Sequence, residues 1–370
     1  MIFLLYIALF VMTLALAVAI VNIIFGPALI NAPGLQQSPE VSVLIPARNE
    51  ERNIGACLTG MLAQDYPEFE VIVLNDQSQD RTESIVREVM TRDRRIKFIQ
   101  GQELPTGWTG KSWACYQLSQ HASGDILIFT DADTRHETLA ISNTVAFIQK
   151  YRLDLLSALP QQETVTLAEK MVVPIIDLLA YASLPLWLTY YAPNPSLAAA
   201  NGQWIAFTRE SYEKIGGHQA VKHHLVEDTE LSRLAKRKKM KILTTAGTGA
   251  VFCRMYTTAK EVWWGFSKNF YGLAGYRKST FFSIIGISFI GFVLPYFLLT
   301  VPSVRLFALA VVGLNSVLRG ILALRYKHPI GVSIFLHPFS ILVAILIGFN
   351  SFFSYKRGTI RWKDRDIHYA

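Results

Sequence analysis

Two carboxylates, those of Asp131 and Asp133, stand one residue apart directly after the apolar run 126–130. The run predicts a short buried strand. Two acidic side chains at the end of a buried strand cost free energy unless an opposite charge neutralises them. Mg²⁺ or Mn²⁺ held together with the phosphates of a nucleotide would supply that charge, because these cations favour carboxylate and phosphate oxygens. The pair is a candidate metal site, and the alternative is a polar strand end without a ligand.

The elements that must position this pair alternate along the chain. Four apolar runs predict strands at 41–45, 69–74, 96–99 and 126–130. Helical patterns separate them at about 53–64, 82–90 and 111–121. Such alternation predicts an α/β fold with a parallel sheet, whose ligands bind beyond the carboxyl ends of the strands.

Polar side chains gather at the expected strand ends. The first strand is followed by Pro46, Ala47, Arg48 and Glu50, and the second by Asp76. A nucleobase and a ribose offer hydrogen-bond donors that carboxylates accept. These residues therefore predict a nucleotide-binding floor next to the acid pair, and a solvated loop is the alternative.

Lys111 begins a helical pattern after a loop that contains Gly107 and Gly110. The loop is similar to a phosphate loop, but Pro105 stands where the Gly-x-x-x-x-Gly-Lys-Ser spacing needs glycine, which argues against a P-loop nucleotide hydrolase. A lysine at a helix N-terminus is still suited to a diphosphate, because its charge adds to that of the helix end. We expect Lys111 to contact the nucleotide.

Glu227 and Asp228 precede the helical run 229–239. One interpretation is structural, with Asp228 as the helix N-cap. The other is catalytic, because adjacent carboxylates in a cleft repel each other, which raises one pKa and favours a general base.

Aromatic and polar residues also mark a later segment, where Trp263 and Trp264 precede Lys268 and Asn269. They would contact a sugar face or an apolar acceptor, and contact with a membrane surface is the alternative. His218 follows two glycines and is expected to be structural. The eight histidines show no zinc-binding spacing.

The composition points to a membrane protein: of 370 residues, 51% are hydrophobic and only 17% are charged. Residues 1–25 contain no charge and lack the features of a cleaved signal, so they predict a retained transmembrane anchor. Apolar stretches at 281–301, 306–324 and 330–353 predict a C-terminal transmembrane region over 281–353, followed by a basic tail, 354–370.

The region 40–276 has the composition of a soluble domain, with a nucleotide-binding half at 40–140 and an acceptor half at 141–276. Its segment 171–191 is apolar but interrupted by Pro174 and Pro185, which predicts an interfacial segment. The three cysteines lack metal or redox spacing and are expected to be reduced core thiols.

Charge gives conflicting signals about topology. The lysines and arginines of 40–276 favour a cytoplasmic domain at the plasma membrane, and those of the tail favour the same side. Three spans after the domain would put the tail outside. Either the stretch 306–324, which holds Asn315 and Arg319, does not cross or the tail breaks the rule, and we favour the first. The net charge of +8 suits an anionic leaflet, and scattered basic residues argue against nucleic acid.

Four stretches, in this order, resemble the family 2 glycosyltransferases with a GT-A fold: 43–50 (Val-Leu-Ile-Pro-Ala-Arg-Asn-Glu), 73–78 (Val-Leu-Asn-Asp-Gln-Ser), 131–133 (Asp-Ala-Asp) and 227–228 (Glu-Asp). The stretches 104–111, 200–203 and 362–365 resemble the membrane-anchored bacterial branch that is associated with carotenoid acids and hopanoids. The Gln/Arg-x-x-Arg-Trp motif of the family is incomplete, because 260–264 (Lys-Glu-Val-Trp-Trp) lacks its arginine.

The resemblance implies a GT-A (nucleotide-diphospho-sugar transferase) domain with a mostly parallel mixed sheet, plus N-terminal and C-terminal transmembrane helices. It implies that Asp133 binds the metal, that Asp131 binds the metal or the ribose, and that Asp228, with Glu227, is the catalytic base. The implied nucleotide-sugar contacts are Pro46, Ala47, Arg48, Glu50, Asp76, Lys111 and Asp131. The implied acceptor contacts are Asn201, Trp204, Trp264 and Lys268.

The expected activity is inverting transfer of a hexose from a nucleotide sugar, a UDP-sugar above all, to a membrane lipid such as a carotenoid acid or another isoprenoid or glycolipid. The resemblance implies Mg²⁺ or Mn²⁺ as the cofactor. A processive polysaccharide synthase and a non-catalytic membrane scaffold with a degenerate nucleotide site are the alternatives.

Overall fold

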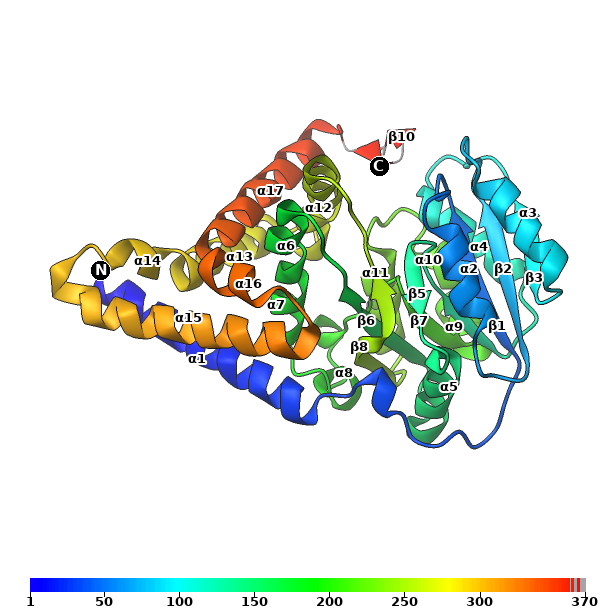
Figure 1. The fold of residues 1–370 in the computed structure, drawn as a ribbon, viewed down its shortest axis with the longest axis horizontal. Coiled ribbons are helices and arrows are strands. Elements are labelled where there is room, and N and C mark those ends of the chain that lie inside the picture. The colour runs from blue at the N-terminus through cyan, green and yellow to red at the C-terminus, as the bar shows by residue number, and fades with distance from the viewer. Residues whose placement is uncertain (360, 363–364, 367–370) are drawn as a thin grey trace. The chain divides into compact units, whose positions relative to one another are not determined.

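The computed structural model describes residues 1–359, 361–362 and 365–366. The chain divides into two compact units (Figure 1). The sheet unit comprises Pro27–Gln161 and Leu186–Arg254, and the helical unit comprises Met1–Gly26, Gln162–Pro185 and the described residues from Met255 onward.

The sheet unit contains an eight-stranded sheet in the order β3-β2-β1-β4-β7-β6-β8-β5. Its strands are β1 (Val41–Ala47), β2 (Phe69–Asn75), β3 (Ile96–Gln100), β4 (Ile126–Phe129), β5 (Thr134–His136), β6 (Leu155–Gln162), β7 (Ile205–Thr208) and β8 (Ile242–Cys253). The first four strands pair in parallel, and β7 is antiparallel to both β4 and β6. A mostly parallel first half and a mixed second half confirm the predicted sheet.

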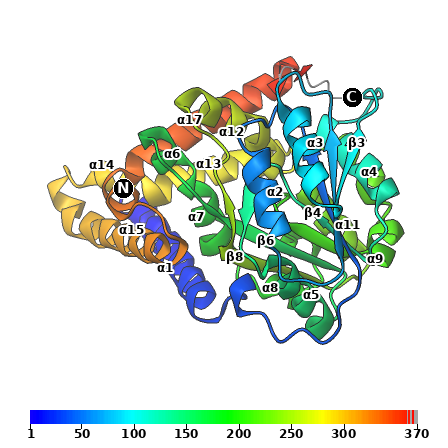
Figure 2. The ribbon, with the colours of Figure 1, turned by 45° about the vertical axis from the view of Figure 1, so that its right-hand side comes forward.

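Helices cover both faces of this sheet (Figures 1 and 2). They are α2 (Ile54–Leu62), α3 (Thr82–Arg92), α4 (Gly110–His121), α5 (Ala140–Tyr151), α8 (Leu188–Tyr191), α9 (Arg209–Ile215), α10 (Gly217–Ala220) and α11 (Glu227–Arg237), with 3-10 turns at Leu29–Asn31 and Pro195–Leu197. Along β1, Val43 and Ile45 pack in one core cluster and Leu44 in another. Burial on both faces explains why the strand sequences are continuously apolar instead of alternating.

The helical unit is assembled from segments that are far apart in the sequence. Its helices are α1 (Ile2–Phe25), α6 (Leu167–Val172), α7 (Pro174–Ser183), α12 (Ala259–Leu273), α13 (Lys278–Phe292), α14 (Leu294–Leu298), α15 (Arg305–Tyr326), α16 (Ile330–Phe335) and α17 (His337–Arg357), with a 3-10 turn at Pro302–Val304. Two short strands, β9 (Arg361–Trp362) and β10 (Arg365–Asp366), pair near the C-terminus. The predicted resemblance at 362–365 falls partly outside the described residues.

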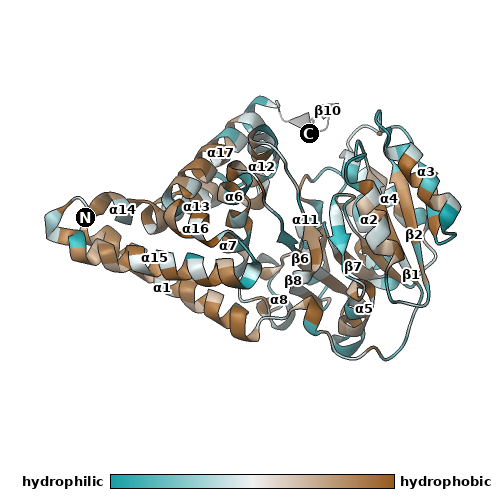
Figure 3. Ribbon diagram, viewed as in Figure 1, coloured by the Kyte–Doolittle hydropathy of each residue, from teal (hydrophilic) through white to brown (hydrophobic). Residues whose placement is uncertain are grey.

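Four helices among the described residues are long and apolar enough to cross a membrane: Ile2–Phe25, Lys278–Leu298, Pro302–Tyr326 and His337–Arg357. Their apolar character is visible in the hydropathy colouring of α1 and α15 (Figure 3). The polar residues of α15, Asn315 and Arg319, are buried within the helical unit. The length of α15 and the burial of these two residues suit a span, whereas the charge of the tail favours a stretch that does not cross, so the topology of 306–324 stays a prediction.

The segment 171–191 is divided among α6, α7 and α8. Pro174 is the first residue of α7 and Pro185 follows its end, so the prolines break the apolar run as expected. The domain boundaries differ from the expected 40–276, because 162–185 and 255–276 belong to the helical unit. Asn22 of α1 ties in the first of these segments, since its amide donates to the carbonyls of Tyr181 and Leu184, each at 2.8 Å.

Candidate active site

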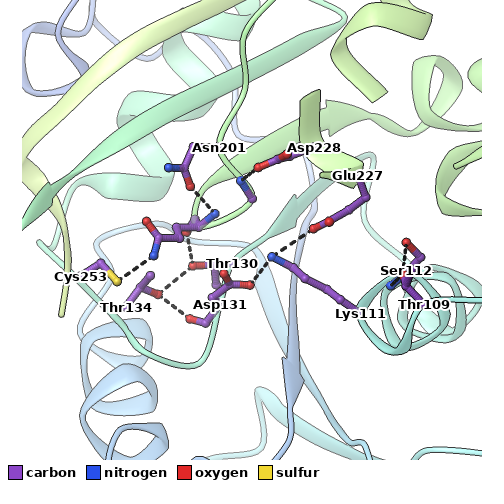
Figure 4. Close-up of polar contacts among 12 residues, drawn as sticks. Thr109, Lys111, Ser112, Thr130, Asp131, Thr134, Asn201, Glu227, Asp228 and Cys253 are labelled. Carbon is purple, nitrogen blue, oxygen red and sulfur yellow. Dashed lines mark hydrogen bonds and ion pairs between the residues drawn. The ribbon is translucent and has the colours of Figure 1, made fainter. Parts of the chain in front are cut away.

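The acid pair lies in a turn immediately after β4, and Figure 4 shows Asp131 of this pair. The hydroxyl of Thr134 donates to the carbonyl of Asp131 at 2.6 Å, and its backbone N–H donates to the same oxygen at 3.3 Å. Thr134 therefore closes the turn formed by Asp131, Ala132 and Asp133. Both carboxylates lie at the carboxyl end of a central strand, as predicted.

A buried hydroxyl group, that of Thr130, links this turn to a second segment. It donates to the carbonyl of Gln203 at 2.7 Å. His136 Nε2 lies 3.1 Å from both the Thr130 and Thr134 hydroxyl oxygens. Since each hydroxyl proton is already committed to a carbonyl, the ring must donate from Nε2. Burial lowers the pKa of His136 to about 3, which keeps the ring neutral.

Lys111 brings the two acidic segments together. Thr109 caps α4, because its side chain accepts from the backbone N–H of Ser112, and this places Lys111 in the first helical turn. The Lys111 ammonium lies 2.7 Å from Asp131 Oδ1 and 3.2 Å from Glu227 Oε1 (Figure 4). Burial lowers the pKa of Lys111, but the two carboxylates outweigh it and hold the pKa well above its usual value. The ammonium is therefore a permanent positive charge between the strand end and α11.

Asp228 is not the N-cap of α11, which is Val226; both acids lie in the first turn of the helix. Its Oδ2 accepts from the backbone N–H of Gly202 at 2.7 Å, and its Oδ1 accepts from that of Thr229 at 2.6 Å. Burial and the negative charge of Glu227 raise the pKa of Asp228 to about 6, against the opposing effects of Lys111 and these backbone bonds. A raised pKa in a carboxylate held by fixed donors suits a general base.

Gly202 leaves room for this arrangement. A Cβ at this position would lie 2.8 Å from Lys111 Nζ, 3.3 Å from Glu227 Oε1 and 3.5 Å from Asp228 Oδ2. Only a residue without a side chain lets the backbone N–H approach Asp228 while the ammonium occupies the space alongside. The neighbouring residue Asn201 uses its side-chain oxygen to accept from the N–H of Gln203 at 2.8 Å, so its predicted acceptor contact stays a prediction.

Burial and the charges of nearby carboxylates raise the pKa of two cysteines, Cys57 and Cys253. Burial raises the pKa of Cys57 to about 12, and the negative charges of Asp133, Glu50 and Asp131 add to the effect. The same three acids raise the pKa of Cys253, again after burial. The three carboxylates therefore act on the same two thiols.

Asp131 and Asp133 could hold a divalent cation only if substrate phosphates and water supplied its other ligands. Among the described residues, no group of three or more His, Cys, Asp and Glu side chains is placed to hold a metal ion. Two hard carboxylates are nevertheless what Mg²⁺ commonly takes from a protein, with substrate phosphates and water completing its coordination. Asp131 and Asp133 match that incomplete donor set.

The loops after β1 and β2, where a nucleotide-binding floor was predicted, contact each other. Arg48 Nη1 donates to the carbonyl of Asp76 at 2.8 Å, and the backbone N–H of Asp76 donates to the carbonyl of Ala47 at 2.7 Å. Asn49 and Gln77 hold these loops with positive φ angles of 51° and 54°. Such angles are uncommon for residues other than glycine and mark a constrained loop. The contacts bring the two strand ends together, whereas their role with a nucleotide stays a prediction.

The structure overturns one predicted acceptor contact. Trp204 has no exposed surface, packs in the core of the sheet unit, and donates from its indole N–H to Thr144 Oγ1 at 2.9 Å. It cannot touch an acceptor without unfolding that core. Trp264 and Lys268 lie on α12 in the helical unit, where Trp264 is half exposed, and they stay predictions. His218 is structural, because it is buried and its Nδ1 lies 2.8 Å from the Tyr212 hydroxyl.

Comparisons with known proteins point to glycosyltransferases. Residues 42–174 match the family model described as glycosyl transferase family 2. A 4,4'-diaponeurosporenoate glycosyltransferase of Staphylococcus haemolyticus is 30% identical over 233 residues, which are 60% of this chain and 58% of that protein. The corresponding Staphylococcus aureus protein is 30% identical over 58% of this chain and 56% of its own length. The chain therefore matches less than two thirds of these relatives.

Among solved structures, a mannosyltransferase from Pyrobaculum calidifontis, in complex with GDP-Man and Mn²⁺, superposes with a TM-score of 0.56 at 18% identity. The match covers 94% of this chain and 99% of that one. At this identity the likeness concerns the fold, which is that of a GT-A transferase with attached helices.

Proposed function

We propose that this chain, whose residues 42–174 match the model of glycosyl transferase family 2, transfers a hexose from a nucleotide sugar, most simply a UDP-hexose, to a lipid acceptor with inversion at the anomeric carbon. The single observation that carries the proposal is the convergence of Asp131, Lys111, Glu227 and Asp228 within one connected cluster. Strand-end acids for a nucleotide diphosphate and a raised-pKa base are thereby joined in one site.

In this mechanism Asp228 takes the proton of the acceptor hydroxyl as the oxygen attacks the anomeric carbon. Its pKa of about 6 leaves it ionised at neutral pH and more basic than an ordinary aspartate. The backbone donors of Gly202 and Thr229 hold both carboxylate oxygens in place. One direct displacement needs no nucleophile from the enzyme and inverts the anomer.

At the other end of the sugar, Asp131 and Asp133 would hold a divalent cation with the diphosphate. The cation, when bound, supplies positive charge that stabilises the leaving group. Arg48, Glu50 and Asp76 would line the nucleoside, because their loops meet beside the acid pair. The two staphylococcal relatives are named for a carotenoid acid, so a lipid carboxylate or hydroxyl is the proposed acceptor class.

The four apolar helices support a lipid as the acceptor. Helices of this length and hydropathy are suited to a bilayer, where a lipid acceptor is dissolved. We propose a multi-pass protein of the plasma membrane with the sheet unit in the cytoplasm, where nucleotide sugars are made. Four spans with the sheet unit between the first and second would leave both chain ends on the opposite side.

The test is mass spectrometry of lipids from cells with and without the chain, repeated with Asp228→Asn. A hexosylated lipid present only with the intact chain is the expected result, and its mass identifies sugar and acceptor together. Lipid profiles that are identical in all three strains, at equal protein levels in the membrane, would refute the proposal.

A further inference from the structure

The ion pair between Lys111 and Asp131 raises a question about the cation. Asp131 is a proposed ligand of the metal, yet its Oδ1 already has an ammonium at 2.7 Å. A divalent cation and an ammonium compete for one carboxylate even when each takes a different oxygen, because like charges so near repel strongly. The arrival of the cation therefore favours departure of the ammonium.

The Lys111 side chain has space to move away from Asp131. Its side chain is 35% exposed, and Asp131 is 27% exposed, so the ion pair faces open space and is not sealed in the core. Its second partner, Glu227, is only 7% exposed and stays fixed at the start of α11. A flexible four-carbon stem at a helix N-terminus can swing while its helix stays still.

We propose that Lys111 is an exchangeable counter-ion: in the nucleotide-free protein its ammonium neutralises Asp131, and when the nucleotide diphosphate arrives with its cation the ammonium leaves Asp131 for the phosphate oxygens. The inference rests on the proposed function, since it needs a donor with a diphosphate. It couples the two ligands: the cation binds weakly alone because it must displace Lys111, and strongly with the diphosphate because Lys111 then gains a new partner.

This coupling predicts that one substitution changes the affinity for Mn²⁺ and the affinity for the nucleotide in opposite directions. Lys111→Met keeps the length of the side chain and removes its charge. In the full chain in detergent, Mn²⁺ binding without nucleotide, measured from the electron paramagnetic resonance signal of free Mn²⁺, should become about tenfold tighter or more. Binding of UDP or GDP in the presence of Mn²⁺, measured by calorimetry, should become about tenfold weaker.

Two further variants make the test specific. Lys222→Met removes a nearby exposed lysine whose ammonium lies 6.0 Å from the Trp108 ring centroid, and it should change neither affinity more than about twofold. Gly202→Ala keeps all charges but puts a Cβ 2.8 Å from Lys111 Nζ. By pushing the ammonium off its bridge, it should tighten Mn²⁺ binding several-fold even where Lys111→Met is poorly folded.

The outcomes separate the inference from the proposed function. Unchanged or weaker Mn²⁺ binding in both Lys111→Met and Gly202→Ala overturns the exchange of counter-ions, whatever the nucleotide does. Tighter Mn²⁺ binding in both variants supports it. A wild-type chain that binds neither UDP nor GDP counts against the nucleotide-sugar proposal, and that result is read from the wild type alone.

Discussion

The two units each bury a carboxylate against a basic side chain, but in different ways. In the sheet unit, Lys111 bridges Asp131 and Glu227 while a third to a quarter of Lys111 and Asp131 stays exposed; with Asp228 these residues form the open cluster. In the helical unit, His328 Nε2 lies 2.7 Å from Asp177 Oδ2 with 1% and 4% of the side chains exposed; this is the sealed pair.

The difference separates two uses of polar groups. A sealed pair has no access for a ligand, so it contributes to packing and costs stability when one partner is lost. The open cluster combines solvent access, a lysine that stays protonated and one carboxylate with a raised pKa, which are typical of a site that binds or reacts. The two clusters should therefore respond in opposite ways to loss of an acid.

The largest effect is expected from Asp228→Asn. Transfer to an alcohol acceptor should fall about 10³-fold in kcat, because the proposed general base is lost. A carboxylate acceptor is already ionised and should lose much less. Radiolabelled sugar transfer to paired alcohol and carboxylate acceptors measures both, and full activity on the alcohol would remove Asp228 from this role.

The same variant should not lose stability. The pKa of Asp228 in the folded protein, about 6, lies above its ordinary value of 3.8. The contribution of this group to the free energy of unfolding is therefore fully present below pH 3.8 and is lost as the pH rises through 6. At neutral pH the ionised side chain therefore destabilises the fold. Asparagine can accept only one of the two backbone bonds that Asp228 accepts, and this loss offsets the removed cost of ionisation, so a thermal melt of Asp228→Asn at pH 7.5 should give a Tm close to that of the wild type.

The sealed pair should show the reverse. Asp177→Ala leaves His328 buried without its carboxylate and should cost about 2–3 kcal/mol, a fall in Tm of about 5 °C or more, with kcat/KM of the folded protein unchanged. Glu88→Gln is the matched control, because Glu88 pairs with Arg92 at the surface, where 63% of its side chain is exposed. Equal Tm values for the two variants would contradict the comparison.

The smallest effect is on pH dependence. Lys111 and Glu227 face Asp228, whose pKa is about 6, so the ionised fraction of Asp228 falls as the pH is lowered through this value. Transfer to an alcohol at pH 5.5 should be about fourfold slower than at pH 7.5, whereas a carboxylate acceptor should lack this step. Rate profiles on the two acceptors give the measurement, and identical profiles would place the titrating group elsewhere.

Much of the sheet unit was predictable because its signals are local. The runs that became β1, β2, β3 and β4 are apolar throughout, and the residues after them lie together simply because parallel strands end at one edge. The pairing of Lys111 with Asp131 and Glu227 was beyond reach, since it depends on how α4 and α11 lie over that edge.

Other features left weaker signals. Trp204 was predicted as an acceptor contact only from the family resemblance, and its burial in the core could not be read from the local sequence. Gly202 was part of a recognised stretch, but nothing local shows that three charged groups surround it. Thr130, Thr134 and His136 carry no motif at all, because their roles come from hydrogen bonds made after folding.

The Thr130 hydroxyl has a consequence for how this site can be varied. It lies beside the turn that contains Asp131 and donates to the carbonyl of Gln203, in the segment whose Gly202 N–H donates to Asp228. Substitutions at these positions should be strongly epistatic, since a change that one segment tolerates shifts the other by the same hydrogen bond. Libraries that aim at a new donor or acceptor will therefore do better by randomising both segments at once than by improving either alone.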